Sequence, residues 1–183
     1  MTSSGQGDGT GTPDRDLATG DLSSERAKEL YQEMLDRMGA AYETGDFDAY
    51  CDAIEAPFTL ATFEHEITMR TQDDLRVMFN AFRKRLDQVG VTQFVRSCIA
   101  AEFHGPEMIE GTHVSSCLRD GMYIEDPFPV TSILRRRGPH WKAASSQNAL
   151  PDPSLFTQVM VEARQKICPE GRDPNGPGDR PET

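Results

Sequence analysis

The spacing of apolar residues along the chain predicts three amphipathic helices. The first begins near Ser23 or Ser24, the second follows the capping-box-like sequence Thr71-Gln72-Asp73-Asp74, and the third follows Asp152-Pro153, with proline at the first helical position. Apolar side chains recur every three or four residues in each segment, which gives one stripe that a core can bury. The stripes comprise Ala27, Leu30, Tyr31, Met34, Met38, Ala41 and Tyr42; Leu75, Met78, Phe79, Phe82, Leu86 and Val89; and Leu155, Phe156, Val159, Met160, Ala163 and Ile167.

A corner between two helices is predicted near the middle of the first half of the chain. Gly45 can adopt the left-handed conformation that ends a helix, and Asp46 can cap the next helix. We expect Pro57 to end the short helix that Asp46 begins, because proline cannot donate a backbone hydrogen bond. A strand, a turn at Glu64-His65-Glu66 and a short returning strand are predicted to follow.

Four longer runs after Gly90 are typical of strands joined by hairpins. They are Thr92–Phe103, Met108–Leu118, Phe128–Arg136 and Trp141–Ala149, separated by turn-forming glycines and prolines. Polar, glycine-rich segments at both ends contain too few apolar groups to offset the entropy of ordering them. The expected organisation is a disordered tail over 1–22, one α+β domain over 23–150, a C-terminal helix over 151–168 and a second disordered tail over 169–183.

Composition narrows the classes of partner. The 183 residues carry a formal net charge of −11, which argues against nucleic acids and anionic membrane surfaces as partners. The four cysteines are widely spaced and form no C-x-x-C pair, so they indicate no zinc site or dithiol redox centre. The sequence shows no signal-peptide pattern and no apolar run long enough for a membrane helix, so we expect a cytoplasmic protein.

The order of elements and two short motifs resemble a known family. Ala40-Ala41-Tyr42 before Gly45-Asp46-Phe47-Asp48-Ala49-Tyr50, together with Gly138-Pro139-His140-Trp141-Lys142, is similar to the superfamily of nuclear transport factor two, SnoaL-like proteins and ketosteroid isomerase. The resemblance implies an α+β cone, in which a curved, mixed and mainly antiparallel sheet wraps around the N-terminal helices. It also implies a pocket at the open end, while the fold by itself selects no activity.

The resemblance does not extend to the catalytic residues of the steroid isomerase. The position of its tyrosine oxyanion donor holds Met38, that of its general base holds Thr62, and that of its buried protonated aspartate holds Ser132. None of these side chains supplies a base or a strong acid. We therefore predict no catalytic residue, no metal and no cofactor, and a pocket that contacts ligand. The expected ligand-binding residues are Met38, Tyr42, Thr62, Thr112, Val114, Ser116, Val130, Ser132 and Asn148.

Three groups of polar residues could have more specific functions, as catalytic residues or metal ligands, and each also has a simpler explanation. His113 could act as the acid or base of a dehydratase, but the same alignment places it on the outer face of the sheet. Glu64, His65 and Glu66 could hold a metal only with ligands from elsewhere. Arg96 and Glu102 could belong to an epoxide-hydrolase arrangement, although an ordinary cross-strand charge pair on the outer face also explains them.

Three functions remain open at this point. The first is non-catalytic binding of a small, largely apolar molecule in the cone. The second is a lyase or isomerase that uses His113, and the third is an interaction protein with a vestigial pocket. A homodimer is expected as well, because the predicted strand parity places four apolar residues on the outer sheet face. They are Ile109, Cys117, Ile133 and Trp141.

Overall fold

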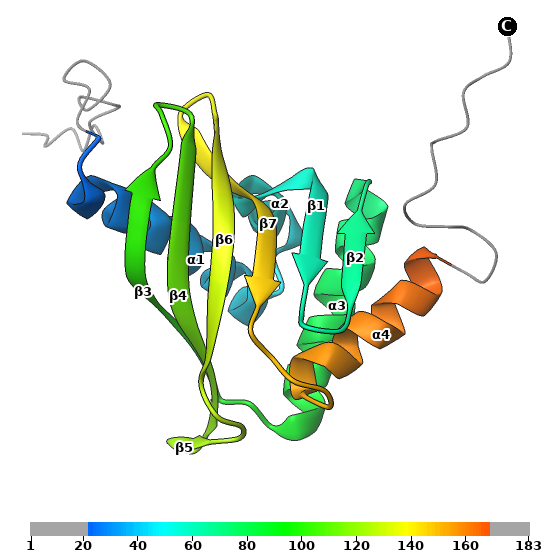
Figure 1. The fold of residues 1–183 in the computed structure, drawn as a ribbon. Helices are drawn as coiled ribbons and strands as arrows, with labels where there is room; N and C mark the ends of the chain where they lie inside the picture. Colours follow the sequence, from blue (N-terminus) through cyan, green and yellow to red (C-terminus); the bar gives the residue numbers. More distant parts are fainter. Residues whose placement is uncertain (1–21, 169–183) are drawn as a thin grey trace, which may run out of the picture.

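A computed structural model describes residues 22–168, which form four helices and seven strands (Figure 1). Both predicted tails lie outside this range, apart from Leu22. The elements, in chain order, are α1 (Ser24–Thr44), α2 (Phe47–Ala53), β1 (Ile54–Ala61), β2 (Glu66–Met69), α3 (Gln72–Val89), β3 (Gln93–Phe103), β4 (Met108–Arg119), β5 (Met122–Tyr123), β6 (Phe128–Arg137), β7 (His140–Asn148) and α4 (Leu155–Ile167).

The strands form one mixed sheet in the order β2-β1-β7-β6-β4-β3, and the short β5 pairs with β4. Only the β1–β7 pair is parallel among the described strands, and the other pairs are antiparallel. The first three helices lie behind one face of this sheet, and α4 packs beside α3 at one end (Figure 1). The predicted α+β class, with a mainly antiparallel sheet around the N-terminal helices, is confirmed.

Local sequence signals set the helix boundaries. Gly45 ends α1 with φ 75°, and the Asp46 side chain accepts a hydrogen bond of 3.0 Å from the backbone N–H of Ala49 at the start of α2. Thr71 and Asp74 form the predicted capping box of α3. These bonds satisfy N–H groups that have no partner inside the helix.

Two boundaries differ from the prediction. Pro57 does not end α2, because the helix stops at Ala53 and Pro57 lies within β1. The pairing of β1 with β7 shifts register between Ile54 and Thr59, and a residue that lacks an N–H is tolerated at such an irregularity. The last helix begins at Leu155 rather than at Pro153, because Ser154 provides its cap.

The predicted apolar outer face is also wrong. Ile109, Cys117 and Trp141 are buried in the core between the sheet and the helices, and Ile133 is half-buried. Side chains alternate across a strand, so a parity error of one residue in β4 exchanges its two faces. The β6–β7 pairing also shifts register between Ile133 and Leu134, which changes the parity along β7.

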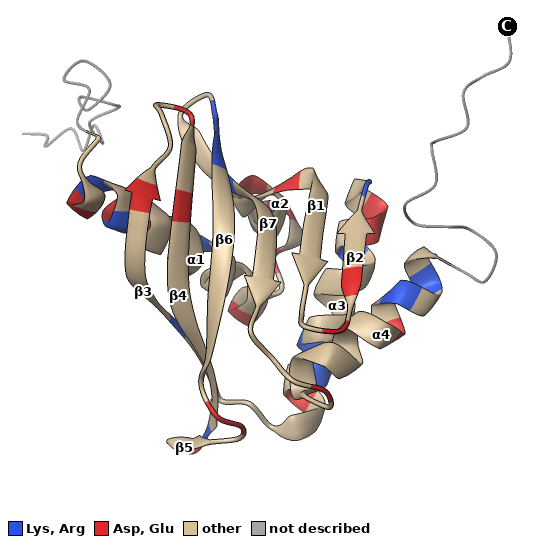
Figure 2. Cartoon of the chain, viewed as in Figure 1, with Lys and Arg blue, Asp and Glu red and all other residues tan. Residues whose placement is uncertain are grey.

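Charge is unevenly distributed over the fold. Lysine, arginine, aspartate and glutamate lie mainly on the helices, the turns and the strand ends, while long stretches of β4, β6 and β7 carry none (Figure 2). Between Leu22 and Cys168 there is no helix with the length and apolar character that crossing a membrane requires.

Candidate functional site

The concave face of the sheet and the helices enclose a cavity of about 60 Å³. Helices α1 to α3 cover it, and Phe156 of α4 contributes at one end. Its apolar lining consists of Met34, Leu35, Met38, Ile54, Phe58, Leu60, Met78, Phe82, Phe94, Phe128, Val130, Ala143 and Phe156. Its polar lining consists of Tyr42, Tyr50, Arg96, His113, Ser115, Ser132, Ser146 and Asn148.

The structure brings together only some of the predicted ligand-binding residues. Those that line the cavity are Met38, Tyr42, Val130, Ser132 and Asn148. Those that do not are Thr62, Thr112, Val114 and Ser116. The division follows the parity of β4, whose cavity-facing residues are His113 and Ser115 rather than their neighbours.

His113 lies inside the cavity, so its predicted place on the outer face is wrong. Its side chain is buried, and its Nδ1 lies 2.9 Å from the hydroxyl oxygen of Tyr31 in a hydrogen bond between β4 and α1. Burial, with a smaller contribution from the positive charge of Arg96, lowers the pKa of His113 to about 3. The imidazole is therefore neutral at physiological pH.

Gly111 makes the position of Tyr31 attainable. A Cβ added at Gly111 would lie 2.4 Å from Cδ2 and from Cε2 of the Tyr31 ring. The missing side chain lets the ring approach β4 closely, so that the hydroxyl group reaches His113 and Ser132. Burial raises the pKa of Tyr31, which keeps the phenol protonated.

Arg96 projects from β3 into the same cavity. Its Nη1 donates to the sulfur of Met38 over 2.9 Å, its Nη2 donates to the carbonyl oxygen of Leu35, and its Cζ lies 5.0 Å from the centroid of the Phe94 ring. Burial lowers the pKa of Arg96 from its ordinary value. Glu102 is exposed and makes no ion pair with Arg96, so the epoxide-hydrolase arrangement is not formed.

Two further tyrosines complete the polar part of the cavity. Tyr42 and Tyr50 pack in the aromatic core with ring centroids 5.2 Å apart and an interplanar angle of 55°, and their hydroxyl groups interact. Burial raises the pKa of both phenols. Tyr50 and Arg96 were not among the predicted ligand contacts. A lone arginine within an apolar strand run was the available signal for Arg96.

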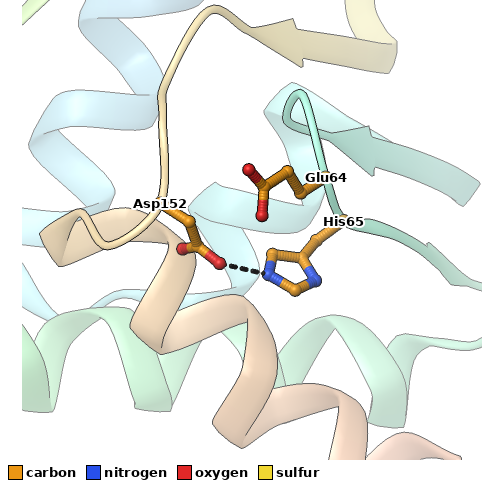
Figure 3. A group of neighbouring side chains, drawn as sticks. All are labelled: Glu64, His65 and Asp152. Carbon is orange, nitrogen blue, oxygen red and sulfur yellow. Dashed lines mark hydrogen bonds and ion pairs between the residues drawn. The ribbon is translucent and has the colours of Figure 1, made fainter.

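A separate cluster lies on the surface, where the β1–β2 turn meets the segment before α4 (Figure 3). The potential ligand atoms of Glu64, His65 and Asp152 all lie within 4.8 Å of one another. His65 Nε2 is already 2.8 Å from an Asp152 oxygen, and bonds from Thr157 and from His65 lower the pKa of Asp152. These contacts connect the β1–β2 turn to the segment before α4, which gives the cluster a structural role.

Comparison with known proteins supports the fold and no more specific relationship. No family model matches the chain, and no curated protein matches it. Among solved structures, a protein of unknown function from Mycobacterium tuberculosis aligns with a TM-score of 0.56 at 13% identity, over 75% of this chain and 88% of that one.

Two further structures agree with this result. A domain of unknown function with a cystatin-like fold from Nostoc punctiforme has a TM-score of 0.55 at 11% identity, over 81% of this chain and 91% of that one. An NTF-2-like protein of unknown function from Shewanella oneidensis has a TM-score of 0.53 at 11% identity, over 67% of this chain and 98% of that one. The chain therefore has the nuclear transport factor two-like, or cystatin-like, fold.

Proposed function

We propose that this protein binds a small, largely apolar molecule in the cone cavity and does not convert it. The observation that carries the proposal is the lining itself. Methionine, phenylalanine and aliphatic side chains from α1, α3 and the sheet surround the space, and a few polar groups are fixed at defined places on its wall. An apolar cavity with few convergent polar groups is the usual form of a small-molecule site.

The size of the cavity limits the ligand. Its volume of about 60 Å³ is less than half that of a cavity of about 150 Å³ that accommodates benzene. Benzene has six non-hydrogen atoms, so an occupant with about four to six of them requires a side chain of the wall to move, and a molecule as large as a steroid would displace many. Phe156 is the side chain best placed to move, because it is only partly buried and comes from α4 at the end of the cavity.

A second candidate function is a lyase or isomerase that uses His113. The hydrogen bond between Tyr31 and His113, of which His113 lines the cavity, favours it, because such a pair can transfer or stabilise a proton. The pKa of about 3 argues against it, since a general base works best with a pKa near the operating pH. We therefore rank binding above catalysis.

Methionine methyl groups provide a direct test of binding. Met34, Met38 and Met78 line the cavity, whereas the side chain of Met122 is exposed on β5. Protein labelled with ¹³C at the methionine methyls would be titrated with butan-2-one and followed by NMR. We expect saturable shifts of the three cavity methyls, with a Kd on the order of millimolar for so small a ligand. Met122 serves as the control, and equal shifts at all methyls would contradict a cavity site.

We also propose that the chain forms a homodimer and acts in the cytoplasm. Support for pairing comes from Val95 and Ile99 on the edge strand β3, which are 45% and 54% exposed. Exposed apolar side chains on an edge strand favour association with another chain. The cytoplasmic location rests on the sequence alone.

A further inference from the structure

We propose that the ligand is a short aliphatic monocarboxylate whose carboxylate is bound by Arg96. This inference rests on the proposed binding function and adds the chemical class of the ligand. The apolar wall formed by the methionines and phenylalanines would receive the hydrocarbon part, and the guanidinium would receive the charge.

No side chain of the described residues neutralises the charge of Arg96 by an ion pair. Both of its hydrogen-bond acceptors are uncharged, and one of them, the sulfur of Met38, is a weak acceptor. Asp36 raises the pKa of Arg96, but its effect is smaller than that of Tyr42, Tyr50 or Tyr31. Its carboxylate is exposed and accepts a hydrogen bond of 2.8 Å from Gln32. Within residues 22–168, Arg96 has no salt bridge.

An uncompensated cation in such a place is costly unless something pairs with it. Burial lowers the pKa of Arg96, which shows that its environment disfavours the charge, yet arginine remains protonated in proteins. A guanidinium offers five donors in a planar fork that matches the two oxygens of a carboxylate. Two of those donors are used by Met38 and Leu35, which leaves others for a ligand.

The surroundings of Arg96 favour an anion over a cation or a neutral molecule. Among the described residues that line the cavity, none is acidic, although the whole chain has a net charge of −11. Tyr42, Tyr50 and Ser115 carry hydroxyl groups that can donate to a carboxylate oxygen, and Ser115 lies directly opposite Arg96 in the β3–β4 pairing. His113 is neutral, so Arg96 is the one charged side chain among the described residues of the lining.

The backbone is adapted to the guanidinium. Gly39 lies within α1, where glycine is less favourable than alanine. A Cβ at this position would lie 3.3 Å from Nη2 of Arg96, so a larger residue would crowd the guanidinium. The small residue and the arginine thus form one arrangement that holds the charge at the cavity wall.

An organic anion fits the cavity better than an inorganic one. Most of the lining is apolar, so inorganic phosphate or sulfate, which has oxygens on every side, would place some of them against methionine and phenylalanine side chains. A four-carbon carboxylate places one charged group at Arg96 and its alkyl chain against the apolar wall. Its six non-hydrogen atoms need more than the resting volume of about 60 Å³, so the Phe156 side chain must move when butyrate binds.

The test compares butyrate with its neutral isostere butyramide at pH 7, using the methionine methyl shifts of the full chain. For the wild-type protein we expect a Kd for butyrate at least about tenfold lower than that for butyramide, as hydrogen bonds to charged groups contribute more than neutral ones. Arg96→Met should remove this difference while butyramide binding persists, which also reports that the cavity is intact. Arg135→Met, at an exposed position of β6, is the matched control and should preserve the difference.

The outcomes separate the two proposals. If butyramide and butan-2-one bind but butyrate binds no more tightly, the carboxylate inference fails and the binding function stands. If none of the three compounds shifts the cavity methyls, both proposals fail. Should Arg96→Met not fold, Arg96→Lys decides: it keeps the charge but loses the planar fork, so the butyrate preference should fall by a factor of about three or more. An unchanged preference in that variant would overturn the role of Arg96.

Discussion

Replacing Gly111 with alanine tests the packing that fixes the polar wall of the cavity. In an ordinary strand this change stabilises the protein by roughly 0.5–1 kcal/mol, because glycine loses more entropy on folding. Here the new Cβ would lie 2.4 Å from two ring carbons of Tyr31 and 3.0 Å from Cγ. The ring is completely buried between α1 and β4, and its hydroxyl group is fixed by His113, so it has little room to move.

The expected cost follows from these contacts. Inserting one methyl group into a well-packed core typically costs about 1–3 kcal/mol. Displacing Tyr31 would also weaken its hydrogen bond with His113, which adds roughly 1 kcal/mol. After subtracting the gain of roughly 0.5–1 kcal/mol for replacing a strand glycine, we expect Gly111→Ala to lower the free energy of unfolding by about 1–3 kcal/mol in urea denaturation. The melting temperature should fall by roughly 2–12 °C for a chain of this size.

A double-mutant cycle identifies the cause. Tyr31→Ala removes the ring that the new methyl group would strike, so Gly111→Ala should cost less than about 0.5 kcal/mol in that background. The coupling between the two substitutions would then nearly equal the cost of Gly111→Ala alone. An equal loss of stability in both backgrounds, or no loss in the wild-type background, would refute the steric argument.

Three further predictions concern acidity, cavity size and assembly. The pKa of His113 is about 3 in the folded protein and ordinarily 6.5, so as pH falls the imidazole of the unfolded chain is protonated before that of the folded protein. The stability due to this group is therefore complete above pH 6.5 and is lost as pH falls towards 3. Urea titrations should show this group removing about 2 kcal/mol between pH 7 and pH 5, and His113→Gln should lack that part of the decline. Phe156→Ala should cost about 1–2 kcal/mol in unfolding free energy and lower the Kd of benzene, measured from the cavity methyl shifts, because the wild type must displace this ring to admit six non-hydrogen atoms. Light scattering at micromolar concentration should give a dimer mass that Ile99→Lys reduces to that of a monomer, and a monomeric wild type would contradict pairing.

The sequence predicts the helices well because their signals are local. Gly45, Asp46, Thr71 and Asp74 determine helix ends through bonds to residues within one turn, and the structure contains those bonds. The stripes of apolar residues also lie in the core. Such features need no knowledge of which strand lies beside which.

The candidate site was harder to predict because it depends on strand parity. Both faces of β4 carry small and polar residues, so composition does not distinguish the face of His113 from that of Thr112. The register shifts in the β3–β4 and β6–β7 pairings change parity within strands, and the sequence gives no clear sign of them. The place of Arg96 in the cavity depends on α1, more than fifty residues earlier in the chain.

A crystal structure of the full chain grown with butyrate would show whether Arg96 binds a carboxylate inside the cavity. We expect the carboxylate within about 3.2 Å of the Arg96 guanidinium nitrogens, with the alkyl chain among the methionine and phenylalanine side chains of the cavity. Butyrate density only on the outer surface, with the cavity containing water at saturating butyrate, would contradict it.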